Sequence, residues 1–483
     1  MKAIAFSRII VVLALAGAVP LTAGTSPATR TAATSPPAAT QVSRTATRIG
    51  VNRGSTTSTT SGSTARTSTT GTTITVSASG SSSSCLTCHY SVAASVASTP
   101  HQCTGCHGAS ALNHAAAPDD PSAIPSVSVQ ATVCAVCHSS SQRPVYPEWT
   151  SSGHSEVTPG ALSAMRLSSA NLKTCGACHS GSVRMALLDG RNPATASDGL
   201  NVPVVCVVCH DQHAATGNPA QLRNPVASTN NFHLLIADAS SASAFKAKAA
   251  ARVNLCAQCH NDRGAAWTDS TAPHASVQYN YLLGAVGMLS GGPATFNPGV
   301  HSGLPSAASE SLSGTFYLAN QCVDCHMQAP ANGPASAHSH DTFTLKYGVC
   351  ANCHDGQLAQ TIFTPVFSNE VVSVISGLNI WAATKAPAAL RIGGTVAWEY
   401  STPGGLFWQT NSSGFVASWT QNSQVPFKGP SLANQALIPD NIKKARFDLY
   451  LFVNDGSLGV HNPTLSIGLL SAAEDFILDE LNQ

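Results

Sequence analysis

All sixteen cysteines of this 483-residue chain lie in one motif, Cys-x-x-Cys-His, which occurs eight times. No cysteine is left over for a disulfide framework or for a lone redox site. Successive motifs begin between 18 residues (85 to 103) and 66 residues (256 to 322) apart, so they do not form a tandem repeat of fixed length. The motifs begin at Cys85, Cys103, Cys134, Cys175, Cys206, Cys256, Cys322 and Cys350.

The chemistry of the motif explains its spacing. Two cysteines three positions apart can form thioethers with the two vinyl groups on one edge of a porphyrin, and the adjacent histidine can then reach the iron. Zinc sites also use Cys-x-x-Cys, but they combine it with a second pair of ligands and need no histidine after each pair. Thioredoxin-like sites use a single pair. The sequence therefore predicts eight covalently bound haem c groups with their iron.

The predicted attachment cysteines are Cys85, Cys88, Cys103, Cys106, Cys134, Cys137, Cys175, Cys178, Cys206, Cys209, Cys256, Cys259, Cys322, Cys325, Cys350 and Cys353. The predicted proximal iron ligands are His89, His107, His138, His179, His210, His260, His326 and His354.

Each iron needs a second axial ligand if it is six-coordinate. Ten histidines lie outside the motifs, whereas methionine, the rival ligand, occurs only five times. The number of spare histidines favours bis-histidine ligation, which leaves no open position on the iron and suits electron transfer. His233 and His338 are the two surplus histidines. The predicted distal ligands are His101, His114, His154, His213, His274, His301, His340 and His461.

The N-terminus has the features of an export signal. Lys2 and Arg8 precede an apolar run from Ile9 to Val19, which is too short to span a bilayer but suits the core of a signal peptide. We predict a signal peptide at residues 1–24 and an exported protein that is periplasmic, on the outer surface or extracellular.

Residues 25–84 have a different composition, in which 32 of 60 residues are Ser or Thr and the only charges are arginines. Such a segment buries too little apolar surface to offset its ordering entropy, so we expect disorder. It is either a tether that lets the folded part move or a plain spacer.

Composition limits the fold and the partners. Charged residues make up 10% of the chain, and 37 Gly and 28 Pro indicate much turn and coil between short elements. A formal net charge of +1 gives no support for nucleic-acid binding. No later stretch approaches the roughly 20 apolar residues of a membrane span, so none is predicted in the mature chain.

We expect a mainly α-helical protein with much coil, in which a haem array replaces much of the core. The octahaem-binding region would be 85–354, and 355–483 would be a C-terminal helical cover that supplies a haem ligand, with a separate small domain as the alternative reading. Apolar periodicity predicts a helix over 369–384 that Ser368 could cap, a second over 440–450 and a third from Pro463 onward. Asp455-Gly456-Ser457 would turn the chain before the third helix, whose apolar stripe would be Leu465, Leu469, Ala472, Phe476 and Ile477. The segment from Gly393 to Thr420 could form strands.

The eight motifs, the sequence Cys322-Val-Asp-Cys325-His326-Met327 and the closing segment from Asp455 to Pro463 resemble an octahaem cytochrome c. The chain is similar to the multihaem cytochrome superfamily of pentahaem nitrite reductases and hydroxylamine oxidoreductases. The resemblance implies stacked haem pairs, a mostly helical C-terminal end and a role in respiration or extracellular electron transfer.

The chain departs from both enzymes. Every motif ends in His, whereas the active haem of the nitrite reductases has Lys at that place, and nothing marks a tyrosine cross-link of the hydroxylamine oxidoreductase type.

Three functions follow from these features. The favoured one is an exported carrier that transfers electrons along bis-histidine haems between redox partner proteins. The alternatives are a reductase or oxidase of small nitrogen or sulfur compounds (nitrite, hydroxylamine, tetrathionate) with one open haem, and a self-associating, filament-forming cytochrome in which another copy donates a distal histidine. No catalytic residue is predicted.

Overall fold

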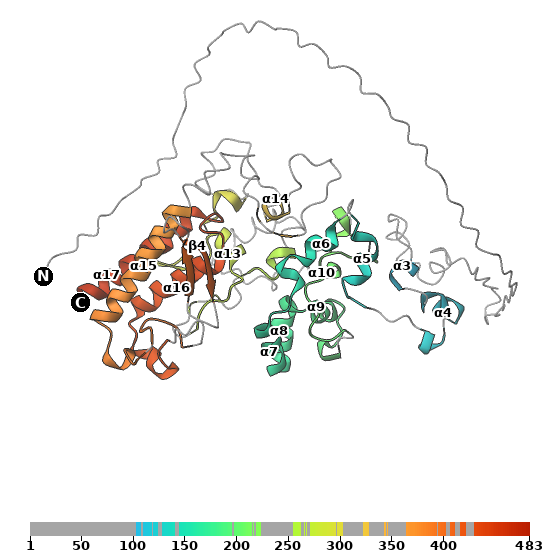
Figure 1. Ribbon diagram of the computed structural model, residues 1–483, viewed down its shortest axis with the longest axis horizontal. Coiled ribbons are helices and arrows are strands. Elements are labelled where there is room, and N and C mark those ends of the chain that lie inside the picture. The colour runs from blue at the N-terminus through green and yellow to red at the C-terminus, as the bar shows by residue number, and fades with distance from the viewer. Residues whose placement is uncertain are drawn as a thin grey trace, which may run out of the picture. The chain divides into compact units, whose positions relative to one another are not determined.

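The computed structural model describes residues 103–223, 255–302, 322–327, 342–345 and 364–483, with short gaps inside most of these ranges (Figure 1). The predicted signal peptide and tether lie outside the described residues. So do the motifs that begin at Cys85 and Cys350, together with His101, His233, His338 and His340.

Helices are the main regular structure of the described residues, which confirms the prediction of a mainly helical chain with much coil. The α-helices are α3 (Cys103–His107), α4 (Ser110–Ala116), α5 (Thr132–His138), α6 (Val145–Thr150), α7 (Pro159–Leu167), α8 (Ser169–His179), α9 (Gly181–Leu188), α10 (Cys206–Cys209), α13 (Gln278–Leu282), α14 (Cys322–His326), α15 (Thr364–Thr384), α16 (Asp440–Asp455) and α17 (Pro463–Asn482). Short 3₁₀ turns are η2 (Pro121–Ala123), η3 (Gly153–Ser155), η4 (Pro193–Thr195), η5 (Pro219–Gln221), η7 (Val300–Ser302), η10 (Ala388–Leu390) and η11 (Leu432–Leu437).

Two small antiparallel hairpins are the β-structure of the described residues. β1 (Met288–Leu289) pairs with β2 (Gly292–Pro293). β3 (Leu406–Thr410) pairs with β4 (Val416–Gln421), with Trp408 opposite Trp419 and an irregularity after Gln409. The second hairpin confirms the strands predicted in this segment, where aromatic and β-branched residues favour extended backbone.

Small polar residues begin the helices around the fourth motif. The side chain of Thr158 accepts a hydrogen bond from a backbone N–H in the first turn of α7, and Ser168 and Ser180 do the same for α8 and α9. These caps satisfy backbone donors that have no partner inside the helix. They divide residues 159–188 into three short helices, the second of which ends on His179.

A conventional hydrophobic core lies in the C-terminal region. α15, α16 and α17 pack together there with α13 and β1 (Figure 1). The helix starting at Pro463 buries the predicted stripe from Leu465 to Ile477, since Asn462 caps it and Pro463 occupies its first turn. α16 extends five residues beyond the predicted end at Tyr450. α15 begins at Thr364, so Ser368 lies inside the helix rather than at its cap.

By length and composition, Pro365–Thr384 of α15 is apolar enough to cross a membrane, which was not expected from the sequence. One face of this helix, with Val371, Leu378 and Trp381, is buried in the C-terminal core. Its other face is exposed and includes polar residues such as Asn369 and Ser376. This amphipathic pattern is the one expected of a helix at the edge of a protein core.

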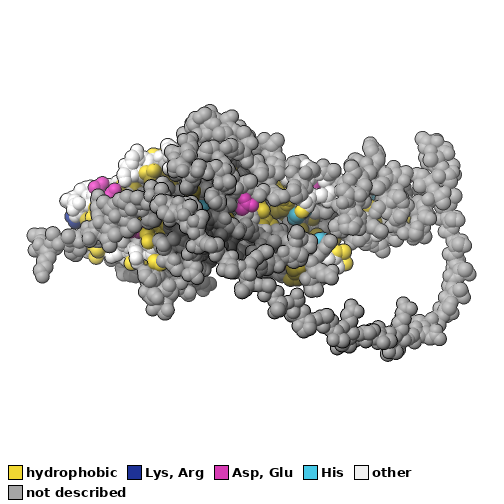
Figure 2. All heavy atoms as spheres, turned by 90° about the horizontal axis from the view of Figure 1, so that it is seen from above, with side chains coloured by type: hydrophobic (Ala, Val, Ile, Leu, Met, Phe, Trp, Pro, Cys, Tyr) yellow, Lys and Arg dark blue, Asp and Glu magenta, His cyan; other side chains and the backbone are white. Residues whose placement is uncertain are grey.

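The region that carries most of the described motifs has little side-chain core. Its buried apolar residues form two small clusters, one around Val202 and Val205 and one around Met165 and Val183. On the face shown in Figure 2, histidine side chains of the described residues reach the surface beside hydrophobic ones, with few charged side chains around them. This is the amount of core expected where a prosthetic group contributes much of the buried surface.

A tight turn joins α16 to α17. Gly456 ends α16 with φ of 70°, and Gly459 has φ of 86°. A Cβ atom on Gly459 would lie 2.5 Å from the ring of Phe367 in α15. Only glycine combines this backbone conformation with such a close approach.

We expect Gly459→Ala to lower the free energy of unfolding by about 1–3 kcal/mol, because it adds both a strained φ and a steric overlap. Urea unfolding followed by far-UV circular dichroism measures this change. The matched control is Gly160→Ala in α7, where a Cβ atom meets nothing within 4 Å. We expect that variant to be unchanged or slightly more stable. An equal loss in both variants would contradict the role assigned to the turn.

Candidate haem sites

The described motifs are single helical turns. α3 and α14 each coincide with a complete motif, and α5 and α8 end on a motif histidine. Residues three apart on a helix are neighbours on one face, so both cysteines of a motif point to the same side. The backbone thus presents two sulfur atoms together with a histidine at the end of the turn, which is the geometry that attachment at one porphyrin edge requires.

The structure brings eight histidine rings together in four pairs. Every pair contains one motif histidine and one histidine from outside the motifs. The pairs and their ring-centroid separations are His107 with His213 (6.0 Å), His260 with His154 (6.1 Å), His179 with His274 (5.9 Å) and His326 with His461 (6.2 Å). All four non-motif members are among the predicted distal ligands.

The separation of the rings fits a shared metal ion. Metal–imidazole bonds are about 2 Å long, so two rings on opposite sides of one ion have centroids about 6 Å apart. The four separations agree with this spacing within a few tenths of an ångström, while the angle between the rings varies from 9° to 72°. Direct aromatic stacking would not require that each pair combine a motif histidine with a non-motif one.

Hydrogen bonds at Nδ1 orient four of these eight rings. His326 Nδ1 donates to the carbonyl of Phe343 at 3.0 Å, His260 Nδ1 to Oε1 of Gln278 at 3.1 Å, and His274 Nδ1 lies 3.1 Å from the hydroxyl of Ser276. Such a bond fixes the tautomer and leaves Nε2 as the metal-binding nitrogen. The same arrangement occurs at His210, which bonds Ala220 O at 2.7 Å, and at His301, which bonds Val460 O at 2.6 Å.

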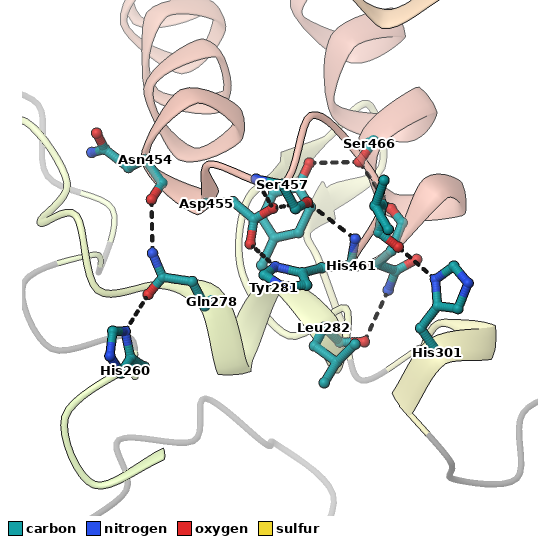
Figure 3. Close-up of polar contacts among 12 residues, drawn as sticks. His260, Gln278, Tyr281, Leu282, His301, Asn454, Asp455, Ser457, His461 and Ser466 are labelled. Carbon is teal, nitrogen blue, oxygen red and sulfur yellow. Dashed lines mark hydrogen bonds and ion pairs between the residues drawn. The ribbon is translucent and has the colours of Figure 1, made fainter. Parts of the chain in front are cut away.

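His461 differs from these histidines because its Nδ1 partner is a carboxylate. Asp455 Oδ1 lies 2.6 Å from His461 Nδ1, and the Asp455 side chain is fully buried. Figure 3 shows the two residues at the turn between α16 and α17, with Ser457 beside them. The hydroxyl of Ser457 donates to Asp455 and accepts a hydrogen bond from the backbone N–H of His461 at 3.0 Å.

Burial lowers the pKa of several of the paired rings. It lowers the pKa of His154 to about 4, with a further contribution from the nearby His260. Burial also lowers the pKa values of His179, His260, His274 and His326. The neutral imidazole that results is the form that binds a metal. At His461, burial alone would lower the pKa, but the charge and hydrogen bond of Asp455 outweigh it and raise the pKa.

Cysteines of different motifs lie next to one another. A hydrogen bond that the Cys256 thiol donates to Cys322 raises the pKa of Cys256, and one that Cys259 donates to Cys178 raises the pKa of Cys259. A third thiol contact joins Cys134 to Cys206 and raises the pKa of Cys134. The motif at Cys256 therefore touches both the fourth motif and the seventh.

Two residues connect neighbouring histidine pairs. Gln278 accepts from His260 and donates to the carbonyl of Asn454 at 3.0 Å, next to Asp455 (Figure 3). Phe343 accepts from His326 through its carbonyl, while its ring lies 4.4 Å from the ring of His154. The pairs His154–His260 and His326–His461 are thus held in a common framework.

The sequence analysis did not identify the hydrogen-bond partners of the histidines. Asp455 was noted only as part of a turn, although its position six residues before His461 could have suggested a contact. Gln278, Phe343 and Ser276 had no sequence signal, since each depends on the folded chain. The predicted ligands His114, His138, His210 and His301 are described but are not assigned to a pair here.

No protein-family model matches the sequence, and a comparison with curated proteins finds no match. Among solved structures, the chain is similar to the outer cell wall cytochrome OcwA, with a TM-score of 0.45 and 18% identity over 78% of this chain and 70% of OcwA. It is also similar to the undecahaem cytochrome from the S-layer of Carboxydothermus ferrireducens, with a TM-score of 0.43 and 19% identity. That match covers 78% of this chain and 50% of the undecahaem protein. At these low values, function has to be inferred from the chain's own residues.

Proposed function

We propose that this chain is an exported multihaem c-type cytochrome that transfers electrons between redox partner proteins. The observation that carries the proposal is the set of four histidine pairs, each made of one motif and one non-motif histidine. Their ring centroids are about as far apart as those of two imidazoles on opposite sides of one metal ion. The eight Cys-x-x-Cys-His motifs support covalent attachment of eight haems.

The roles of the ligating residues follow from the pairs. His107, His179, His260 and His326 are the proximal ligands of their own motifs. His213, His274, His154 and His461 are the respective distal ligands, all from the same chain. When bound, haem c supplies an iron that cycles between the ferric and ferrous states and so holds one electron. The two imidazoles of each pair would hold the iron between them and would leave no position on it for another ligand.

The contacts between motifs support transfer over a series of closely spaced groups. The second and third motifs are close enough that, after burial, the charge of Cys137 raises the pKa of Cys106. The third and fifth motifs touch through Cys134 and Cys206, and the sixth motif touches the fourth and the seventh. The fifth and sixth motifs are also close, since after burial the charge of Cys256 raises the pKa of Cys209. We infer that the attachment sites form a series with a branch at the motif of Cys256.

The proposed export rests on the apolar run after Lys2 and Arg8 and on covalent haem itself. Residues 25–84 would act as a tether or spacer ahead of the haem-binding part. The mature chain would then function in the periplasm, on the cell surface or outside the cell.

The purified holoprotein tests the proposal. We expect eight iron atoms per chain, colour that acid–acetone does not extract, and low-spin ferric signals in electron paramagnetic resonance. A substantial high-spin signal that binds cyanide, together with turnover of nitrite, hydroxylamine or tetrathionate, would instead support the enzyme. Filaments in electron microscopy would favour assembly with a distal histidine donated in trans. Loss of the colour to acid–acetone would refute covalent haem altogether.

A further inference from the structure

The side chain that accepts a hydrogen bond from His461, Asp455, is a carboxylate, whereas the acceptors beside the other histidines are neutral groups. The Nδ1 atoms of His210, His260, His274, His301 and His326 lie against carbonyl, amide or hydroxyl oxygens, which are neutral. The partner of His461 is a carboxylate at 2.6 Å.

The contacts of Asp455 are those of a carboxylate that accepts hydrogen bonds. Oδ1 accepts from His461, and Oδ2 accepts from both the backbone N–H and the hydroxyl of Ser457. The side chain is fully buried, and water does not screen it from the imidazole. Its position is fixed, since Asp455 is the last residue of α16 and Gly456 turns the chain directly after it.

A buried negative charge on the outer side of an imidazole strengthens that imidazole as a ligand. The Nδ1 proton is drawn toward the carboxylate, and electron density at Nε2 rises. A stronger donor favours the ferric state over the ferrous state, because the ferric ion carries the greater positive charge. Neutral acceptors, such as the amide of Gln278 beside His260, have a weaker effect of the same kind.

We propose that Asp455 lowers the reduction potential of the haem attached at Cys322 and Cys325. This inference rests on the proposed function, since it requires the haem and the ligation by His461. Asp455 acts through His461 and is therefore a positioning and tuning residue. The step it tunes is uptake of one electron by ferric iron to give ferrous iron, with no bond formed or broken.

Asp455→Asn in the full-length holoprotein tests the inference. The amide keeps an acceptor for His461 Nδ1 and removes the charge. We expect one step of a spectroscopic redox titration with dithionite to shift in favour of the reduced form by about tenfold, which is ~59 mV for one electron. One low-spin ferric signal should also move in electron paramagnetic resonance, while the others stay in place.

Two further variants separate tuning from structural support. Asp440→Asn removes the same charge from the exposed start of α16, where the side chain is 78% exposed, and should leave every step unchanged. Asp455→Glu keeps the charge and should restore most of the low potential. If Asn and Glu shift the titration equally, or if the Asn variant gains a high-spin signal, Asp455 only holds His461 in place and the inference is wrong.

If the redox titration of Asp455→Asn is the same as that of the wild-type protein, the inference is also overturned. The proposed function would survive each of these results, because it fails only if the wild-type protein lacks covalent haem or the expected low-spin iron.

Discussion

A His461→Ala variant of the holoprotein is expected to acquire one high-spin ferric haem that binds cyanide. The ring of His461 lies 6.2 Å from that of His326, and their assignment as one axial pair leaves that iron with a single protein ligand once the imidazole is removed. The expected high-spin fraction is about one-eighth of the total iron, given eight motifs. Electron paramagnetic resonance and a cyanide titration followed by absorbance measure it.

His461→Met is the matched control for this result. Methionine restores a sixth ligand, so the iron should stay low-spin, and His/Met ligation should raise its reduction potential. If His461→Ala remains fully low-spin, another residue ligates this iron and the assigned pair is wrong. If His461→Met is high-spin as well, the turn after Asp455 has changed and methionine does not reach the iron. The movement of one low-spin ferric signal in Asp455→Asn then tests whether His461 is the ligand.

The C-terminal helices could be predicted because their signals are local. Leu465, Leu469, Ala472 and Phe476 repeat at helical spacing, and the Asn462–Pro463 pair marks the start of α17. The error at α15 also has a local cause. Ser368 resembles a helix cap, but the apolar residue Phe367 just before it is buried against Phe452, so the helix continues toward the N-terminus.

The pairing of histidines could not be predicted because it depends on contacts that are distant in sequence. His213 lies three residues after the motif histidine His210, yet its ring stacks with that of His107. His154 lies nearest in sequence to the third and fourth motifs but faces His260 of the sixth. Spacing shows which residues have the chemistry of ligands, whereas the fold decides which two of them share one iron.

Arg446→Met is expected to cause the largest loss of stability, because it leaves a buried polar cluster in α16 and the C-terminal core incomplete. Arg446 is fully buried. Its Nη1 donates to the carbonyl of Trp398 at 2.8 Å and to Oε1 of Gln435 at 2.8 Å, and its guanidinium lies 3.8 Å from the centre of the Tyr400 ring. Burial lowers the pKa of Arg446, because removing the guanidinium from water disfavours its charged form. These partners offset that cost.

Glu399 is the acidic member of this cluster. It is 2% exposed, and Oε1 accepts hydrogen bonds from the hydroxyl of Tyr450 and from the backbone N–H of Tyr400. Arg446 also donates to its carbonyl at 3.1 Å. Removing only Arg446 takes away the positive charge that acts on the Glu399 carboxylate, and it leaves three oxygens without this donor. Breaking a buried charge pair in this way costs about 3–5 kcal/mol.

That loss is a large share of the roughly 5–15 kcal/mol that stabilises a typical domain. We expect a clearly lower urea midpoint for Arg446→Met, measured by far-UV circular dichroism on the holoprotein. The matched control is Arg391→Met, an exposed arginine whose side chain donates a hydrogen bond to the carbonyl of Ala383. That change should stay within about 0.5 kcal/mol.

A double variant shows whether charge or packing causes the loss. Arg446→Met combined with Glu399→Gln removes both charges at similar volume, and replacing a whole buried pair is often neutral where breaking it is costly. Partial recovery of the urea midpoint in the double variant would assign the loss to the unpaired carboxylate. A double variant that is less stable than Arg446→Met would assign it to packing against Tyr400, because the carboxylate would no longer need compensation.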